Sequence, residues 1–322
     1  MDLNDLKRPA IKHLHTSSKK LARLPRQAMV KTQFPIRSAP TPTGVTPLPT
    51  NLRANYDTAW ARKMPARIAR RAALETLGRG VASYYADPKI YNADRLTDLE
   101  GPVIFASNHH SHADTLMMKV ALPKPWRHKV FIAAAGDYFF DNHTSAVLSA
   151  LFIGAIPIER ESISRKSIEQ PIKLLRTGWS MVIFPEGGRS SDGWGRDFRA
   201  GVGFLAKQAN VPVVPIHLEG TSTILAKGKN WPSRSHVTVN FGSPMWFGDD
   251  DNNRSFTERL EHEVSVLADE DTTDWWSARL RSHAGTTPSL HGPDISAWRR
   301  RWARGDRRRK PASQIEKPWP FI

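Results

Sequence analysis

The group of side chains best suited to chemistry is the run NHHSHAD at 108–114, which directly follows an apolar segment. Neutral imidazole is a general base near neutral pH, and a carboxylate on its other nitrogen orients the ring. His109 and Asp114 lie five residues apart, or about 500° on a continuous helix, so they can meet only if His109 lies in the turn before a helix. Ser111 as N-cap, with Asp114 three residues later, predicts such a helix start. We therefore predict that Asp114 holds the ring of His109 while that ring takes a proton from a hydroxyl group.

The same run allows two other interpretations. His109, His110 and His112 could bind zinc, but adjacent histidines rarely converge on one ion and the sequence has no further cluster of ligands. Ser111 and Asp114 could also do no more than cap a helix. The absence of cysteine excludes a thiolate zinc site, a disulfide framework and a catalytic thiol.

A second candidate site is the run FPEGGRS at 184–190, again after an apolar segment. Gly187 and Gly188 permit a sharp turn and a close approach of the backbone to a ligand. Glu186 offers a hydrogen-bond acceptor, and Arg189 offers a clamp for an anion. The alternative is a simple Gly-Gly turn beside a solvated ion pair.

Three further runs have less specific chemistry. GAIPIER at 154–160 ends in Arg160, which at the end of a strand can bind phosphate or cap the edge of a sheet. VPVVPI at 211–216 is apolar, and its prolines keep it from being fully hydrogen-bonded along its length. GVGFLA at 201–206 imitates a dinucleotide-binding turn, but it follows the polar run 196–199 instead of a strand, so helix packing explains it better.

From about residue 95, short apolar runs alternate with segments of helical periodicity. We predict strands at 102–108, 129–135, 154–160, 180–186, 211–219 and 236–242, and helices at 114–121, 145–152, 164–176 and 201–208. Ser255 and Glu258 form a capping pair that predicts one more helix start. The alternation favours an α/β fold with a largely parallel sheet flanked by helices. Both candidate sites then lie at carboxyl ends of strands, where ligands bind in such sheets.

The net charge of +16 is concentrated outside this core. Residues 1–90 carry 17 Lys or Arg against 5 Asp or Glu, whereas residues 91–250 carry 17 against 15. We predict a disordered basic, Pro-rich tail at 1–55, a basic amphipathic helical segment at 56–92, a catalytic core at 93–250, and a C-terminal helix with an Arg- and Trp-rich tail at 251–322. No run of about 18 apolar residues is present, so a transmembrane helix is not expected.

The amphipathic segment begins with Trp60, Met64 and Ile68, which recur every four residues, and Pro65 marks a start or a kink. Its basic residues occupy the other face of the helix: Arg62, Lys63, Arg67, Arg70 and Arg71. Such a helix can lie in the head-group plane of an anionic membrane. Alternatively, its apolar residues pack on the core while its arginines stay in solvent.

In chain order the four main runs read N-H-x-S-x-x-D, G-x-I-P-I-x-R, F-P-E-G-x-R-S and V-P-V-V-P. This order resembles the glycerolipid acyltransferase family, whose members acylate glycerol-3-phosphate or lysophosphatidic acid, and the resemblance covers residues 100–245. It implies His109 as the general base and Asp114 as its partner. It also places Gly154, Arg160, Glu186, Gly187, Arg189 and Ser190 around the glycerophosphate acceptor, and Pro215 beside the acyl donor. Gly188 departs from the pattern, because Thr is common there in lysophosphatidic acid acyltransferases.

The resemblance implies transfer of an acyl group from an acyl-CoA or acyl carrier protein thioester to a hydroxyl of a lysophospholipid or glycerophosphate. The first expectation is conversion of 1-acylglycerol-3-phosphate to phosphatidic acid, and acylation of glycerol-3-phosphate or another lysolipid is the alternative. Without a Cys or a G-x-S-x-G elbow, direct transfer is favoured over an acyl-enzyme. No metal or bound cofactor is expected. We expect a peripheral protein on the anionic cytoplasmic side of a membrane.

A nucleic-acid-binding protein is the rival from a different class. It would use the net positive charge, with Trp298 and Trp302 stacking among the arginines of 299–310. The excess charge lies outside the predicted core, however, and the sequence has no recognition module. We therefore expect no nucleic-acid partner.

Overall fold

The computed structural model describes residues 52–159, 165–190, 193–225 and 231–293, together with 295, 299, 300 and 303. Within these residues, seven strands form one sheet in the order β1-β7-β6-β2-β5-β3-β4. The strands are β1 (Lys89–Tyr91), β2 (Ile104–Ser107), β3 (Val130–Ala135), β4 (Ala155–Ile158), β5 (Ser180–Ile183), β6 (Val213–Glu219) and β7 (Thr238–Phe241). Of the predicted tail at 1–55, residues 1–51 lie outside the described residues.

The sheet is largely parallel, which confirms the predicted fold class. The strands β4, β3, β5, β2 and β6 all run in one direction. Only β7 pairs antiparallel with β6, and β1 pairs parallel with β7. The short, exposed strand β1 was not predicted, because three residues are too few for a pattern. β5 lies between β2 and β3, so the carboxyl ends of β2 and β5 are neighbours at one edge.

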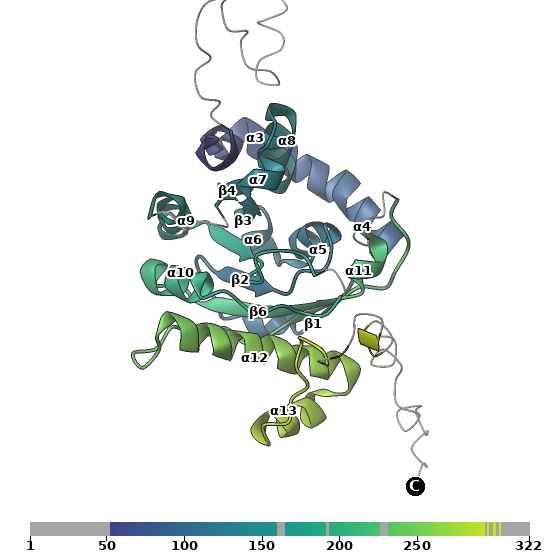
Figure 1. Cartoon of the computed structure of the whole chain (residues 1–322). Coiled ribbons are helices and arrows are strands. Elements are labelled where there is room, and N and C mark those ends of the chain that lie inside the picture. The colour runs from purple at the N-terminus through teal and green to yellow at the C-terminus, as the bar shows by residue number, and fades with distance from the viewer. Residues whose placement is uncertain are drawn as a thin grey trace, which may run out of the picture.

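Helices cover both faces of the sheet (Figure 1). The chain order of the longer ones is α3 (Met64–Ala73), α4 (Arg79–Ala86), α5 (Ala113–Ala121), α8 (His143–Leu148), α9 (Arg165–Arg176), α10 (Gly201–Ala209), α12 (Asn253–Thr272) and α13 (Trp275–His283). Short helices are α6 (Lys124–Arg127), α7 (Gly136–Phe139), α11 (Thr221–Ile224), η1 (Arg53–Asn55), η2 (Ala59–Arg62) and η4 (Ala93–Leu96), and the π-helical turns are η3 (Leu74–Gly78) and η5 (Ser149–Ile153). None of the helices in the described part of the chain is long and apolar enough to cross a bilayer.

Alternate residues of the central strands belong to two separate cores, as expected when both faces of a sheet are covered. Phe105 of β2 packs in the core that α4, α5 and α11 close, whereas its neighbour Ile104 packs in the core closed by α9, α10 and α12. Figure 1 shows the same division, with α12 on one side of the sheet and α5 with α11 on the other. The sheet is therefore the rigid middle layer from which the loops of the candidate site project.

The N-terminal helix differs from its predicted amphipathic arrangement. Arg70, assigned to the basic face, is only 6% exposed, while Met64 and Ile68 are 62% and 61% exposed. The reason is that the backbone carbonyls at the end of η5 have no hydrogen-bond donors within the helix. Arg70 donates to the carbonyls of Ala61, Ala150 and Leu151, and Lys119 donates to those of Phe152 and Ile153. Burial lowers the pKa of Arg70 to about 10, and burial together with the charge of Arg70 lowers the pKa of Lys119 to about 7.

Two local expectations also change. The helix predicted to start at Ser255 has Asn252 as its N-cap, and Ser255 completes the capping box from the N3 position. β6 is a central strand although it contains Pro215. The backbone nitrogen of Pro215, which has no hydrogen to donate, faces β7. It lies between two stretches of pairing on that side: the bridge from Val213 to Met245 and the ladder with β7 that starts at Ile216. The proline therefore interrupts one ladder and leaves the pairing with β2 intact.

Candidate active site

His109 and Asp114 meet at the carboxyl end of β2. His109 Nδ1 lies 2.8 Å from Asp114 Oδ2, and the same oxygen accepts hydrogen bonds from the backbone N–H groups of His110 (2.7 Å) and Ser111 (2.8 Å). Helix α5 starts at Ala113, so the histidine lies in the turn and the aspartate in the first helical turn, as predicted. The N-cap is His112, however, and not Ser111.

The carboxylate of Asp114 is fully buried, and its environment keeps it charged. Burial by itself would raise its pKa, but the hydrogen bond and charge of His109, the charge of His110 and the N–H of Ser111 outweigh burial and lower it. An ionised Asp114 accepts the Nδ1–H of His109, so the lone pair of the ring is on Nε2. The His109 ring also stacks on Phe184, with ring centroids 4.2 Å apart. These contacts fix the plane of the imidazole.

Hydrogen bonds join the turn at 108–114 to the loop at 184–190. Glu186 Oε1 accepts the backbone N–H of His109 at 3.0 Å, and the carbonyl of His109 accepts the N–H of Ser190 at 3.0 Å. On the other side, the Asn108 amide exchanges two hydrogen bonds of 2.8 Å with the backbone of Leu218 in β6. The backbone of His109 is therefore held from both neighbouring strands.

Glu186 is 2% exposed and is not among the residues that line the pocket described below. Burial raises its pKa to about 8; the N–H of His109 and the charge of Arg196 oppose this shift, and the charge of Asp114 adds to it. Near neutral pH the side chain is thus a neutral carboxylic acid that positions His109.

Glu186→Gln is expected to remove a pH-dependent loss of stability. The folded state keeps the Glu186 proton up to about pH 8, whereas the unfolded chain releases it near pH 4.5. The contribution of Glu186 to the unfolding free energy of the wild type is therefore lost as pH rises between these two values. The unfolding free energy of Glu186→Gln minus that of wild type should rise by up to about 4 kcal/mol across this window, at about 1.4 kcal/mol per pKa unit. Urea denaturation at pH 5 and pH 8 measures it, with the exposed Glu169→Gln as control; equal pH slopes for wild type and Glu186→Gln would contradict the assignment.

An apolar pocket opens beside the His109 ring and has a volume of about 180 Å³. Its polar lining comes from His109, His112, Thr115, Glu159 and Arg199. The rest of the wall is apolar side chains and glycine backbone, from Ile132–Ala135, Phe139, Ile153, Ile158, Ile168, Pro171, Ile183–Pro185, Gly187, Gly188, Gly201, Val202 and Leu205. An imidazole in the wall of an apolar pocket suits a substrate with a polar reacting group and a hydrocarbon chain.

Arg199 is a candidate functional residue that sequence analysis missed. It lines the pocket, and its backbone N–H donates to the carbonyl of Pro185 at 3.0 Å. Its guanidine lies against Gly187, which has φ +69°: a Cβ there would be 2.7 Å from Arg199 Nε. The sequence signal is the glycine, whose missing side chain makes room, but spacing alone does not reveal that an arginine fills that room.

Arg189 is half-buried and does not line the pocket itself, although the preceding residue, Gly188, does. Its charge is the second contribution, after burial, that lowers the pKa of His112 to about 4, so the His112 ring is neutral. His112 stacks on Tyr138 and its Nε2 lies 3.1 Å from the Tyr138 hydroxyl. The rings of His109 and His112 thus have different partners, which argues against the zinc interpretation of this run.

The other predicted site residues are not gathered at the pocket. Gly154 lies at the amino end of β4, opposite Ile158, with φ +74°, and it ends η5 beside Arg70. Pro215 is buried within β6 and packs against Gly242. Both positions have backbone roles here. Ser190 is buried, and its Oγ accepts the N–H of Gly193. Arg160 lies outside the described residues.

A family model described as Acyltransferase matches residues 87–219. The 1-acyl-sn-glycerol-3-phosphate acyltransferase of Streptococcus pneumoniae is 30% identical over 191 residues, which are 58% of this chain and 67% of that protein. The protein of the same name from Bacillus subtilis is 28% identical over 157 residues, or 49% of this chain and 73% of that protein.

The fold is also shared with a solved structure. The crystal structure of the 1-acyl-sn-glycerophosphate acyltransferase of Thermotoga maritima superposes with a TM-score of 0.53 at 18% identity, covering 67% of this chain and 86% of that chain. The chain belongs to the acyltransferase family that includes the 1-acyl-sn-glycerol-3-phosphate acyltransferases, and it is an O-acyltransferase. The resemblance drawn from the four runs is confirmed.

Proposed function

We propose that the protein transfers an acyl group from an acyl thioester to the free hydroxyl of 1-acylglycerol-3-phosphate, which forms phosphatidic acid. The observation that carries this proposal is the 2.8 Å contact of His109 Nδ1 with Asp114 at the mouth of the apolar pocket. The names of the relatives support the choice of acceptor. The donor is acyl-CoA or acyl carrier protein, and no resident cofactor takes part.

The reaction uses His109 as a general base. Its Nε2 takes the proton of the acceptor hydroxyl while the oxygen attacks the thioester carbonyl, and Asp114 stabilises the imidazolium that forms. The C–S bond of the tetrahedral intermediate then breaks, and the imidazolium returns the proton to the departing thiolate. The N–H groups of His110 and Ser111 already donate to Asp114, so they are not the donors that stabilise the oxyanion of this intermediate.

We propose that the acceptor phosphate binds between Arg199, which lines the pocket, and Arg189, which follows the lining residue Gly188. Guanidinium grips a phosphate through two parallel hydrogen bonds. The backbone at Gly187 and Gly188 lines the same pocket, so a phosphate can approach closely there. A hydrocarbon chain of the substrates then occupies the apolar depth between β3, β4 and α10, where burial of each CH₂ contributes about 0.8 kcal/mol.

An assay of the purified full chain tests this function. Acyl-CoA and acyl carrier protein are each offered with 1-acylglycerol-3-phosphate, glycerol-3-phosphate or 1-acylglycerol, and products are identified by mass spectrometry. Phosphatidic acid should be the main product. If glycerol-3-phosphate proved the better acceptor, acylation of glycerol-3-phosphate would replace the proposed reaction. If 1-acylglycerol reacted as well as 1-acylglycerol-3-phosphate, the proposal that the acceptor carries a phosphate would be refuted.

We further propose that the α3 edge rests on an anionic membrane from the cytoplasmic side. Met64 and Ile68 of α3 are largely exposed, and Leu148 and Phe152 on the adjoining α8 and η5 are about half exposed. Large exposed apolar side chains beside basic ones are typical of interfacial helices. In Figure 1 this edge, with α3 and α8, is at the opposite end of the molecule from α13.

Vesicle flotation is expected to show stronger binding to anionic than to neutral vesicles at low salt. Each basic residue near an anionic surface contributes about 1 kcal/mol, and salt screens this attraction. Met64→Ser with Ile68→Ser should weaken binding, whereas the control Leu280→Ser, an equally exposed change on α13, should not. Equal binding to both kinds of vesicle would refute the electrostatic part, and unchanged binding of the double variant would refute the contact through α3.

A further inference from the structure

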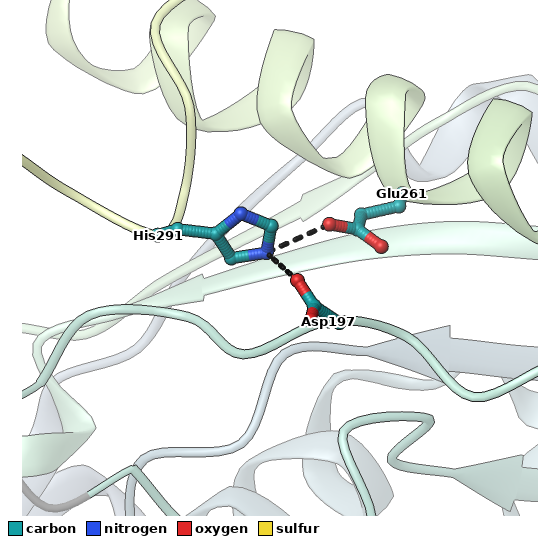
Figure 2. A group of neighbouring side chains, drawn as sticks. All are labelled: Asp197, Glu261 and His291. Atoms are coloured by element: carbon teal, nitrogen blue, oxygen red, sulfur yellow. Dashed lines mark ion pairs between the residues drawn. The ribbon is translucent and has the colours of Figure 1, made fainter. Parts of the chain in front are cut away.

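A second group of chemically capable side chains lies outside the active site, where three distant segments meet (Figure 2). Asp197 belongs to the loop between β5 and α10, Glu261 to α12, and His291 to the segment after α13. One ligand atom of each residue lies within 4.8 Å of the other two. We propose that these residues bind a divalent transition-metal cation of the Zn²⁺ class.

The distances suit a shared ion. His291 Nε2 lies 2.8 Å from Glu261 Oε1 and 3.2 Å from Asp197 Oδ1. Ligands bound tetrahedrally to zinc at about 2.0–2.1 Å lie about 3.3 Å apart. An ion therefore needs only small side-chain movements to bind all three atoms.

The imidazole nitrogen itself points to an ion. His291 Nε2 is shielded from solvent and lies at ion-pair distance from both carboxylates, but it makes no hydrogen bond to either of them (Figure 2). A buried polar atom without a hydrogen bond is costly, and a lone pair directed at a cation removes that cost. The two carboxylates also bring two negative charges to the site, which a divalent ion neutralises.

The surrounding contacts hold two of the three ligands in place. Glu261 Oε2 accepts the N–H of Phe198 at 2.9 Å, so the carboxylate is oriented with Oε1 toward His291. The carbonyl of His291 accepts a hydrogen bond from the guanidinium of Arg300 at 2.8 Å. The side chain of Asp197 is 93% exposed, which leaves a route for the ion and a position for a water ligand.

The ligand types select the ion. Imidazole favours zinc and related transition metals, while Mg²⁺ and Ca²⁺ prefer sites made of oxygen ligands. A bound ion would link the loop at 193–199 to α12 and to the segment at 284–293. Because Arg199 is two residues from Asp197, the ion would also restrict the segment that places Arg199 beside Gly187.

Isothermal titration of the full chain with Zn²⁺, after removal of metals with a chelator, tests the site. One saturable site per chain is expected in the wild type, with no competition from an equal concentration of Mg²⁺. Loss of even an outer-shell partner lowers metal affinity about 10- to 100-fold, so Asp197→Asn, Glu261→Gln and His291→Ala should each lower it by at least about tenfold. His283→Ala, an exposed histidine on α13, is the matched control and should bind as the wild type does.

Thermal unfolding separates loss of the site from loss of the fold. Zn²⁺ should raise the Tm of the wild type and of His283→Ala, because it binds only the folded state. Glu261→Gln keeps an oxygen that can accept the Phe198 N–H, so it should melt like the chelated wild type and show a smaller rise than the wild type at the same Zn²⁺ concentration. No saturable binding, or saturable binding that all three variants retain, would overturn the proposal.

Discussion

His109→Ala is expected to lower kcat/KM for acyl transfer by at least about 10²-fold, the lower range for removal of a general base. Its Nε2 is the ring nitrogen left for the acceptor hydroxyl once Nδ1 is committed to Asp114. Asp114→Asn should be similarly impaired. An amide donates where the carboxylate accepted, which favours the wrong tautomer of the ring and no longer stabilises the imidazolium. Initial rates with 1-acylglycerol-3-phosphate and an acyl thioester measure both effects.

The matched controls are other histidines. His283→Ala removes an exposed imidazole on α13 and should leave activity unchanged. His110→Ala and His112→Ala should be much milder than His109→Ala, although His112 lines the pocket. If either proved as damaging as His109→Ala while its Tm stayed at the wild-type value, the assignment of the general base to His109 would be wrong.

Arg189→Lys and Arg199→Lys are each expected to lower kcat/KM for the acceptor by about 10- to 150-fold, which corresponds to loss of a charge-assisted contact of about 1.5–3 kcal/mol. Lysine keeps the charge but not the paired hydrogen bonds of guanidinium to phosphate. The KM of the thioester donor should change little, since we propose that both side chains bind the acceptor. Steady-state kinetics with one substrate varied at a time gives both constants.

The control for these variants is Arg254→Lys, which changes an exposed ion pair with Glu258 on α12. It should have wild-type kinetics, and all three variants should melt like the wild type. Normal acceptor kinetics for Arg189→Lys and Arg199→Lys would show that these arginines only support the fold. In that case the phosphate site would have to lie elsewhere, while the chemistry at His109 could still hold.

Local sequence patterns determined the elements of this protein and the pairing of His109 with Asp114. The alternation of apolar runs with helical periodicity depends on neighbours in the chain, and the structure has strands within every predicted strand segment. The meeting of His109 and Asp114 could also be predicted, because only five residues separate them and a turn followed by a helix leaves few geometries. Such patterns failed for Arg70. It occupies a polar position on its helix, yet it is buried because it donates to a backbone carbonyl 80 residues later in the chain.

Only the tertiary structure decided which distant residues share a site. Arg199 lies against Gly187 because the loop between β5 and α10 folds back on itself. Gly154 belongs to one of the four runs, but it lies at the amino end of β4, away from the pocket. The backbone is left-handed where η5 ends, and glycine adopts that conformation readily. Asp197, Glu261 and His291 meet from three segments that share no local pattern. Periodicity reports which face of an element is buried, whereas contacts between elements follow from how the two cores pack against the sheet, and no spacing along the chain records that packing.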